Sequence, residues 1–364
     1  RTVLNATPLF PLTSGAVAAR GATRVFRQLS TKGAYGFESA LSILDPRVLR
    51  ACSESQKEHV ESFLQQMKVH DATPVRVIDD HITPLHRGDE WEALDDTTLA
   101  AHLLYVRDHT DEYLAAKGNA QTQALTTLRQ SLRLLSTASS TGSSEYEHAS
   151  DLYLGRAYGD AHDLEAILDS IVDSCVSPRY LGFGSAEGVD SSRQSWRQLF
   201  VKLGAREIPP VYQSSGGTDY RWPDEVLGSL RDSGSDRQRR LLQLITDNWS
   251  YYSQWATRPG QGHRPSSLLS ALRDVLVTVG ERQVPLRTCY ADNEDNRAVF
   301  GTSIPLSRCK WPEKFCEDVG IVYRPTVDNA IERLHSLKAS GCVELAAIEP
   351  IYKFLDARFA QHDE

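Results

Sequence analysis

The sequence lacks the long apolar runs and the basic clusters that mark membrane-spanning and nucleic-acid-binding proteins. No stretch of its 364 residues approaches the roughly 20 consecutive apolar residues that a membrane-spanning helix needs. The first residues, Arg1 to Leu4, do not lead into an apolar core with a cleavage site, which predicts no signal peptide. A net charge of -8 and a pI near 5.8 disfavour broad binding to nucleic acid or anionic membranes. We therefore expect neither a membrane nor a nucleic acid among the partners.

Cysteine is sparse for a chain of this size. A disulfide framework needs a higher density of cysteine in a smaller domain, so we expect a reduced, intracellular and cytoplasmic protein. Four of the six cysteines follow position 288, which raises the question of a zinc site. Zinc ligands usually come in closely spaced pairs, whereas Cys309 and Cys316 are seven residues apart. We expect buried core cysteines and no bound metal at Cys52, Cys175, Cys289, Cys309, Cys316 and Cys342.

No catalytic or nucleotide-binding motif is complete. The glycine-rich segment from Gly182 to Gly188 departs from G-x-G-x-x-G, because its third glycine falls one residue late and no Gly-Lys-Ser/Thr follows. It is also no nucleophile elbow, since Ser185 directly follows Gly184. We interpret this segment as a connection between helices, and Ser214 to Gly217 as a turn. The sequence therefore assigns no catalytic and no cofactor-binding residue.

One short segment does concentrate carboxylates and imidazoles. Asp79, Asp80, His81 and His86 offer the groups that a hydrolytic metal site uses. Their spacing matches no established ligand pattern, and Pro84 argues against a helical i, i+4 pairing. A polar loop is the favoured interpretation, and a metal-assisted hydrolase is the weaker alternative.

Other polar and aromatic groups have structural explanations. Asp163 suits a helix N-cap better than a general base, and the arginines of the 237–240 stretch suit a solvated helix face. The tryptophans lack interleaved basic residues, so we expect packing rather than base stacking. The polar group is Tyr158, Asp160, His162 and Asp163. The arginines are Arg237, Arg239 and Arg240, and the tryptophans considered are Trp196, Trp222, Trp249, Trp255 and Trp311.

A short sequence motif, which we call the phrase, occurs three times and is the most regular feature of the sequence. Each copy has two apolar residues four apart, then Gly or Lys, a small apolar residue, and a Pro a few residues later. Residues i and i+4 share one helix face, Gly permits a left-handed cap, and Pro prevents the helix from continuing. The phrase therefore predicts three amphipathic helix ends, at Phe63–Met67–Lys68–Val69–Pro74, Leu199–Leu203–Gly204–Ala205–Pro209 and Phe315–Val319–Gly320–Ile321–Pro325.

The remaining pattern predicts short strands between amphipathic helices. A hairpin is expected over 8–15, and strands at 75–78, 152–154 and 285–290, with a return strand at 298–300. Helices are expected over 53–69, 95–114, 121–135, 163–171, 192–203, from 223, and over 236–252, 265–279, 326–337 and 344–359.

These elements predict a predominantly helical α+β protein made of tandem units. Each unit has a short strand or hairpin followed by amphipathic helices. We expect a first unit at 1–135, a Ser/Thr/Gly-rich linker or loop at 136–147, a second unit at 148–284, and a shorter third unit at 285–364.

The phrases together resemble the repeated regions of sacsin-like and NO VEIN-like proteins, very large polypeptides with a GHKL-type ATPase domain. The resemblance is carried by Pro8 to Leu12 with Ser14-Gly15, Leu152 to Leu154 with Tyr158, Trp196 to Pro209, and Phe315 to Pro325. It implies a chaperone-like or scaffold role. The acidic catalytic helix, Asp-Gly loop and glycine-rich lid of such an ATPase are not found, so no ATP-site residue is carried over.

We therefore expect a non-enzymatic module, without cofactor or metal, that binds other domains of the same polypeptide or a client protein. Because the chain starts at Arg1 rather than Met, we expect it to be a piece of a longer protein. A stand-alone helical adaptor that binds a peptide in a groove between copies remains an alternative.

Overall fold

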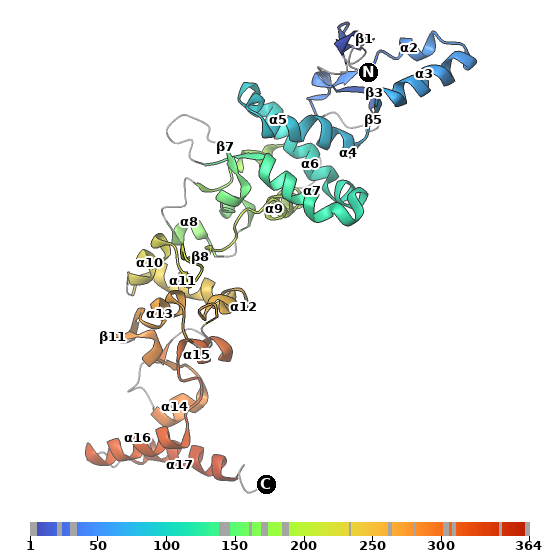
Figure 1. Cartoon of the computed structure of the whole chain (residues 1–364). Helices are drawn as coiled ribbons and strands as arrows, with labels where there is room; N and C mark the ends of the chain where they lie inside the picture. The colour runs from blue at the N-terminus through green and yellow to red at the C-terminus, as the bar shows by residue number, and fades with distance from the viewer. Residues whose placement is uncertain are drawn as a thin grey trace. The chain divides into compact units, whose positions relative to one another are not determined.

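The computed structural model is predominantly helical with short strands, which confirms the α+β expectation (Figure 1). It describes residues 6–19, 24–29, 35–137, 146–159, 162–168, 174–183, 189–232, 234–260, 264–279, 282–300, 306–307, 311–341 and 344–360. The chain divides into two compact units. Unit 1 comprises Arg1–Ala161 with Ile171–Glu207, and unit 2 comprises His162–Ser170 with Ile208–Glu364.

In both units, α-helices make up most of the regular secondary structure. The α-helices of unit 1 are α2 (Arg47–Arg50), α3 (Glu54–Gln66), α4 (Pro74–Val77), α5 (Thr83–Arg87), α6 (Asp96–Lys117), α7 (Gln121–Ser131) and α9 (Val189–Leu203). Those of unit 2 are α8 (Leu164–Ile167), α10 (Asp224–Arg231), α11 (Asp236–Asp247), α12 (Trp249–Tyr252), α13 (Ser267–Arg273), α14 (Glu294–Phe300), α15 (Glu313–Val319), α16 (Val327–Ala339) and α17 (Leu345–Ala360).

All strands are short. Antiparallel hairpins are formed by β1 (Pro8–Pro11) with β2 (Val17–Ala19), β6 (Arg133–Leu135) with β7 (Tyr146–His148), β8 (Tyr212–Gln213) with β9 (Tyr220–Arg221), and β10 (Leu276–Val279) with β11 (Arg282–Pro285). Parallel pairs are formed by β3 (Val25–Leu29) with β4 (Ser42–Ile43) and β5 (His70–Ala72), and by β12 (Tyr290–Ala291) with β13 (Leu306–Ser307).

The three predicted helix ends are confirmed, each with a left-handed residue at the same place in the phrase. The φ angles are 54° at Lys68, 106° at Gly204 and 93° at Gly320. In each, the amide of the following residue donates to the carbonyl five residues before it, the bond that characterises a Schellman cap. These bonds run from Val69 to Leu64, from Ala205 to Phe200 and from Ile321 to Cys316, each at 2.8 Å.

Each cap is followed by the same parallel pairing. The residue two positions after the cap pairs with an earlier strand: His70 with Phe26, Arg206 with Tyr153, and Val322 with Tyr290. The same earlier strand also has a second parallel partner, which comes from the segment between that strand and the phrase helix. Phe26 pairs with Ile43, Tyr153 with Cys175, and Tyr290 with Leu306. The chain therefore contains three equivalent parallel arrangements. In each, the strand that comes first in the sequence lies in the middle, between the second and the third.

A hairpin precedes each arrangement and helices follow it. We name the resulting segments repeat 1 (8–131), repeat 2 (133–273) and repeat 3 (276–360), and the helices after the cap are the closing helices. The hairpin β6–β7 flanks the Ser/Thr/Gly-rich tract, of which residues 138–145 lie outside the described residues. The expected boundaries at 1–135, 136–147, 148–284 and 285–364 stay a prediction.

The expected strand at 75–78 is wrong. Thr73 accepts a hydrogen bond from the Arg76 amide at 3.4 Å, and Pro74 occupies the first turn, where a missing amide costs nothing. A helix follows at once: α4 leads into a π-helical turn at Ile78–Ile82 and then into α5. Pro84 lies in the first turn of α5, so the local spacing is helical after all.

Further element predictions differ from the structure. The strand expected at 285–290 is interrupted by a 3-10 helix at Leu286–Thr288. The helix expected to reach 135 ends at Ser131, and the following residues form β6. The helix expected to reach 279 ends at Arg273, and residues 276–279 pair with β11 as a strand instead. The return strand expected at 298–300 is part of α14, which starts where Asn293 accepts a hydrogen bond from the Asn296 amide at 2.9 Å.

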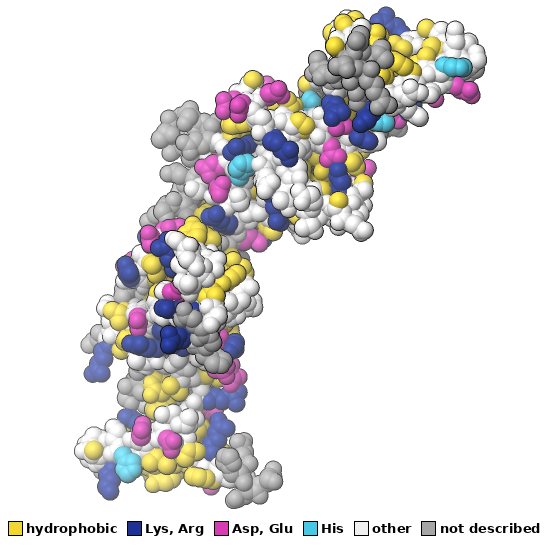
Figure 2. All heavy atoms as spheres, viewed as in Figure 1, with side chains coloured by type: hydrophobic (Ala, Val, Ile, Leu, Met, Phe, Trp, Pro, Cys, Tyr) yellow, Lys and Arg dark blue, Asp and Glu magenta, His cyan; other side chains and the backbone are white. Residues whose placement is uncertain are grey.

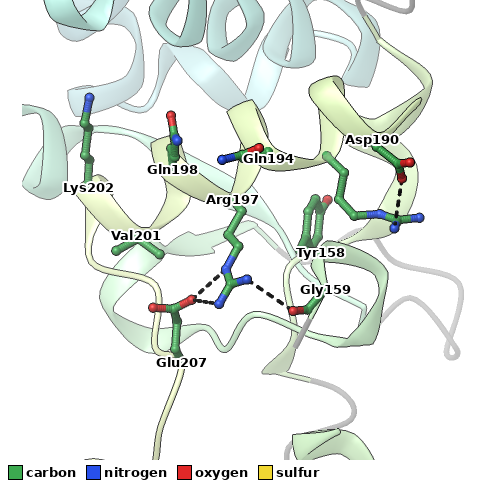
Figure 3. Close-up of a pocket in the computed structure, with 10 residues that line it drawn as sticks. Tyr158, Gly159, Asp190, Gln194, Arg197, Gln198, Val201, Lys202 and Glu207 are labelled. Atoms are coloured by element: carbon green, nitrogen blue, oxygen red, sulfur yellow. Dashed lines mark hydrogen bonds and ion pairs between the residues drawn. The ribbon is translucent and has the colours of Figure 1, made fainter. Parts of the chain in front are cut away.

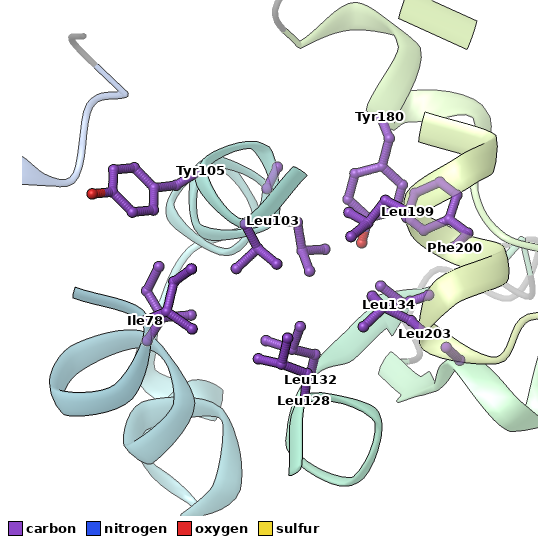
Figure 4. Packing of buried hydrophobic residues seen from close by; sticks show 14 of the residues in the cluster. Ile78, Leu103, Tyr105, Leu128, Leu132, Leu134, Tyr180, Leu199, Phe200 and Leu203 are labelled. Atoms are coloured by element: carbon purple, nitrogen blue, oxygen red, sulfur yellow. The ribbon is translucent and has the colours of Figure 1, made fainter. Parts of the chain in front are cut away.

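The core of unit 1 lies between α6, α7 and α9. Leucines from all three helices meet there, with Leu103 and Leu128 fully buried and Leu199 3% exposed (Figure 4). Phe63 was expected to face the core with Leu64, but it is 39% exposed on α3. In unit 2, a separate apolar cluster joins α14, α16 and α17 through Phe300, Leu337 and Ile351.

Candidate functional site

The segment Asp79 to His86 does not bring its carboxylates and imidazoles together. Asp79 accepts hydrogen bonds from the Tyr113 hydroxyl at 2.9 Å and from Lys117 Nζ at 2.6 Å. Asp80 lies 3.8 Å from Arg24 and 3.7 Å from Arg76. Both carboxylates are thus paired with cations, and the imidazoles point into the core instead.

His81 and His86 form a buried cluster with His102 of α6, which we call the histidine cluster. His86 Nε2 and His102 Nδ1 are 3.3 Å apart, and the ring centroids of His81 and His102 are 5.5 Å apart. The Arg133 amide can only donate, so the His86 Nδ1 atom, 3.4 Å away, must accept. Neutral His86 then carries its proton on Nε2 and donates to His102 Nδ1.

This tautomer order leaves one N–H without a hydrogen-bond partner, at His102 Nε2. His81 Nε2 is likewise buried, and neither atom has a hydrogen-bond partner among the residues that the structure describes. The Phe37 ring stacks on His81 and meets His102 edge-on at 4.8 Å between centroids. The cluster is therefore packed among aromatic rings rather than opened to a ligand.

The histidine cluster is held neutral by its surroundings. Burial lowers the pKa of His81 and of His86 to about 4, and the nearby Arg133 charge lowers the His86 value further. Burial, with the neighbouring His86, lowers the pKa of His102 to about 3. Within the described ranges, no group of three or more His, Cys, Asp or Glu side chains is placed to hold a metal ion. The geometry therefore gives the metal-assisted hydrolase no support.

The other polar groups singled out from the sequence are dispersed. Asp163 is at the N-cap position of α8 but makes no side-chain cap bond, and it lies 4.0 Å from Arg240. His162 is 3.8 Å from Asp247, whereas Asp160 and the Gly184–Gly188 part of the glycine-rich segment fall outside the described residues. Arg239 and Arg240 both pair with Asp236 on exposed turns of α11. Arg237 lies on the same helix and also has a partner.

The described cysteines and tryptophans are mainly core residues, as expected. Cys175, Cys289 and Cys316 are buried, whereas Cys52 is half-buried; Cys309 and Cys342 lie outside the described residues. Burial raises the pKa of both Cys289 and Cys316 to about 12. Of the five tryptophans named in the sequence analysis, four are 5% exposed or less, namely Trp196, Trp222, Trp249 and Trp311.

The outward face of α9 borders a groove of about 680 Å³, which we call the α9 groove (Figure 3). The opposite wall is the turn at Tyr158 and Gly159, where Gly159 has a φ of 83°. A volume of this size falls in the range of small-ligand and peptide clefts. The sequence analysis missed this groove, although its α9 residues follow helical spacing: Asp190, Arg193, Gln194, Arg197, Gln198, Val201 and Lys202.

One arginine holds the groove together. Arg197 Nε donates to Glu207 at 2.8 Å, and its Nη1 donates to the Gly159 carbonyl at 3.2 Å (Figure 3). Both carboxylate and carbonyl accept from the same guanidinium, so Arg197 links α9 to the two segments that complete the wall. Lys202 is also engaged, 2.5 Å from Asp111.

Arg193 and Val201 are the groove residues with unused binding capacity. Arg193 Nε is buried with no hydrogen-bond partner among the described atoms, and its Nη1 contacts Asp190 only at 3.4 Å. Val201 is 38% exposed and is the apolar residue among the α9 side chains that line the groove. The groove therefore offers a cation at one position and an apolar contact two turns away.

Comparison with protein-family models, with curated proteins and with solved structures finds no match to this chain. In the part of the chain that the structure describes, no helix combines the length and apolar character needed to cross a bilayer.

Proposed function

We propose that the chain is a non-catalytic partner-binding module that binds an extended peptide segment in the α9 groove. The observation that carries this proposal is the pairing of an incompletely bonded Arg193 with an exposed Val201 along one open groove. The resemblance to sacsin-like and NO VEIN-like proteins supports the same class of role. In such a protein, the bound segment would belong to a client or to another domain of the polypeptide.

The groove defines the chemistry of the segment. Arg193 and Val201 are eight residues apart on α9, or about 12 Å along the helix axis at a rise of about 1.5 Å per residue. An extended peptide covers that distance in about four residues at roughly 3.3 Å each. The segment should therefore carry Asp or Glu opposite Arg193 and an aliphatic residue three or four positions away.

The amides of the groove favour a main chain over a rigid small molecule. Gln194 and Gln198 lie on the exposed face of α9 between the two anchor residues (Figure 3). Each offers both a donor and an acceptor, which suits the alternating N–H and C=O groups of an extended peptide. This mode of recognition gives modest affinity, with specificity set by the two anchor residues.

A random octapeptide display library is the first probe. We expect enriched sequences to pair an acidic residue with an aliphatic residue three or four positions away. Fluorescence anisotropy with the enriched peptide should show a roughly 5- to 30-fold weaker Kd for Arg193→Gln, since a charge-assisted hydrogen bond contributes about 1–2 kcal/mol in a partly exposed site.

A matched arginine tests the assignment. Arg179 is also exposed in unit 1 and lies outside the groove, so Arg179→Gln should bind the peptide as the unchanged chain does. Val201→Ser should weaken binding, and it should also remove the aliphatic preference. Equal binding by Arg193→Gln and Arg179→Gln would refute the proposal, as would enriched peptides that lack the acidic and aliphatic pair.

A further inference from the structure

The phrase helices of the three repeats can be compared position by position. Five residues before each cap lie Phe63 in α3, Leu199 in α9 and Phe315 in α15. Leu199 is 3% exposed and Phe315 is fully buried, whereas Phe63 is 39% exposed. The same large apolar position is thus covered in repeats 2 and 3 and open in repeat 1.

The closing helices of the preceding repeat provide the cover. In unit 1, α6 and α7 of repeat 1 pack against α9, and their Leu103 and Leu128 share the core with Leu199 (Figure 4). Arg107 of α6 also lies over the Trp196 ring of α9, at 4.9 Å from its centroid.

The same arrangement recurs between repeats 2 and 3, within unit 2. The Trp249 ring of α12 meets Phe315 edge-on at 5.1 Å between centroids, and its Nε1 donates to Asp318 at 2.9 Å. Helix α13 packs against α15, and Arg273 donates to the Asp318 carbonyl at 2.8 Å. Covering the next phrase helix is therefore a recurrent role of closing helices.

Repeat 1 exposes the surface that such helices would cover. Besides Phe63, its hairpin exposes Leu9 at 40% and Val17 at 56%. In repeat 2, by contrast, the hairpin residues Leu134 and Leu135 are buried in the core that contains α7. We call the surface formed by Leu9, Val17 and Phe63 the head surface.

Repeat 3 has closing helices whose apolar face is uncovered. Helices α16 and α17 border a groove of about 480 Å³, whose lining includes Leu334, Ile348 and Tyr352. Tyr352 is 58% exposed and Ile331 is 39% exposed, with Leu345 at 73% and Phe359 at 55% on the same helix pair. Hydrophobic side chains are visible at the surface both around β1 and α3 and over the α16–α17 pair (Figure 2). We call the surface of α16 and α17 the tail surface.

We infer that the tail surface of one molecule binds the head surface of a second copy of this chain. The junctions inside the chain indicate the kind of occupant, a repeat of this type, because closing helices cover the next phrase helix in both cases that the repeats provide. A second copy of the chain supplies such a repeat. The two surfaces differ, so the contact is heterologous and does not close on itself as a two-fold dimer does. Association is therefore head-to-tail, as an open chain or a closed ring, and it does not depend on the α9 groove.

Sedimentation velocity of the full chain from about 1 to 100 µM, the range of moderate affinities, tests the inference. We expect a series of species that grows with concentration. Because the surfaces are apolar, raising the salt concentration should not dissociate them, unlike an association held by exposed ion pairs. A chain that stays monomeric over the whole range would overturn the inference.

Paired variants then separate head from tail. Phe63→Glu disables the head surface and Tyr352→Glu the tail surface, so each variant alone should be monomeric. Mixed in equal amounts, they retain one intact head and one intact tail, and they should form a 1:1 dimer that grows no further. Failure of the mixture to form a dimer would contradict the head-to-tail assignment.

A control variant excludes a general effect of added charge. Tyr212 is 42% exposed on β8, outside both surfaces, and Tyr212→Glu should associate as the unchanged chain does. If Phe63→Glu fails to fold by circular dichroism, Val17→Glu tests the same head surface at a more exposed position. Unchanged association of a folded head-surface variant would overturn the inference.

Discussion

The repeated helix cap predicts that substitutions at two equivalent positions change the free energy of unfolding in opposite directions. Gly204 and Lys68 both adopt left-handed backbone angles, with φ of 106° and 54°. A non-glycine residue in this conformation costs roughly 1–2 kcal/mol. Gly204→Ala should therefore destabilise unit 1 and Lys68→Gly should stabilise it, in each case by this cost less the roughly 0.5–1 kcal/mol of entropy that glycine gains on unfolding.

The structure limits the effect to the backbone. A Cβ added at Gly204 would lie 3.9 Å from the nearest atoms of Ser150, an ordinary van der Waals distance. No steric clash therefore adds to the conformational cost. At Lys68, as at Gly204, the effect is reduced by about 0.5–1 kcal/mol, because glycine gains more freedom on unfolding. We expect a net stabilisation of about 0.5–1 kcal/mol for Lys68→Gly.

Native-state hydrogen exchange, followed by mass spectrometry on peptides of the unit 1 core, measures these free energies of opening. Lys68→Ala is the matched control, since alanine keeps the left-handed cost while removing the lysine side chain. Its free energy should stay close to that of the unchanged chain. A destabilising Lys68→Gly, or a Gly204→Ala without effect, would refute the assignment of one shared cap.

Three further predictions concern titration, a buried indole and thiol access. The histidines of the cluster have pKa values of about 3 to 4 in the folded chain, against the ordinary value of 6.5. The unfolded chain therefore binds more protons than the folded chain between pH 6.5 and pH 4. The free energy of unfolding should be at its full value above pH 6.5 and should fall as the pH falls toward 4. The loss between pH 7 and pH 5 should be about 2 kcal/mol for each fully buried histidine in urea unfolding, and His102→Gln should flatten this slope. Trp249→Phe removes the indole bond to Asp318 and should cost about 1 kcal/mol in unit 2, whereas a neutral result would show that this bond adds nothing. Alkylation at pH 8, mapped by mass spectrometry, should label Cys52 well before the three buried cysteines, and the reverse order would contradict the burial described above.

The helix ends were predictable because the left-handed backbone of the cap restricts which residue types can occupy it. A left-handed cap needs glycine or tolerates a strained residue, and a proline beyond it stops the helix. That reasoning also found Lys68, whose position in the phrase indicated a cap although its residue type does not favour one. The N-caps at Asp95 and Thr326 were predictable for a similar reason, since each side chain accepts the expected backbone amide.

The parallel pairing was not predictable, because its strands are too short to carry a periodic signal. Tyr153 pairs on both sides through single bridges, and β12 has only two residues. Residues 276–279 illustrate a second limit, since four apolar-rich residues fit a helix face and a strand equally well. The α9 groove depends on Gly159 and Glu207, two residues from distant segments that no local pattern links to α9.

Comparison of the three phrase helices distinguishes positions that the fold requires from positions that are free to serve binding. The capped position is left-handed in all three, and the apolar residue one position earlier is buried in all three, as Met67, Leu203 and Val319. The outward positions differ. Seven residues before the cap, Arg197 corresponds to Glu61 and Glu313, a reversal of charge at one structural position, and each is paired with a different partner.

The position of Val201 differs in the same way, with Gln65 and Glu317 as its equivalents. Val201 is 38% exposed, so part of its side chain is available to a partner. The combination of a constant inner face and a divergent outer face is what a scaffold needs to present different surfaces on one repeated frame. The α9 groove is therefore a feature of repeat 2, and transferring Arg193 and Val201 to the equivalent positions of α3 should not create peptide binding without the opposite wall at Gly159.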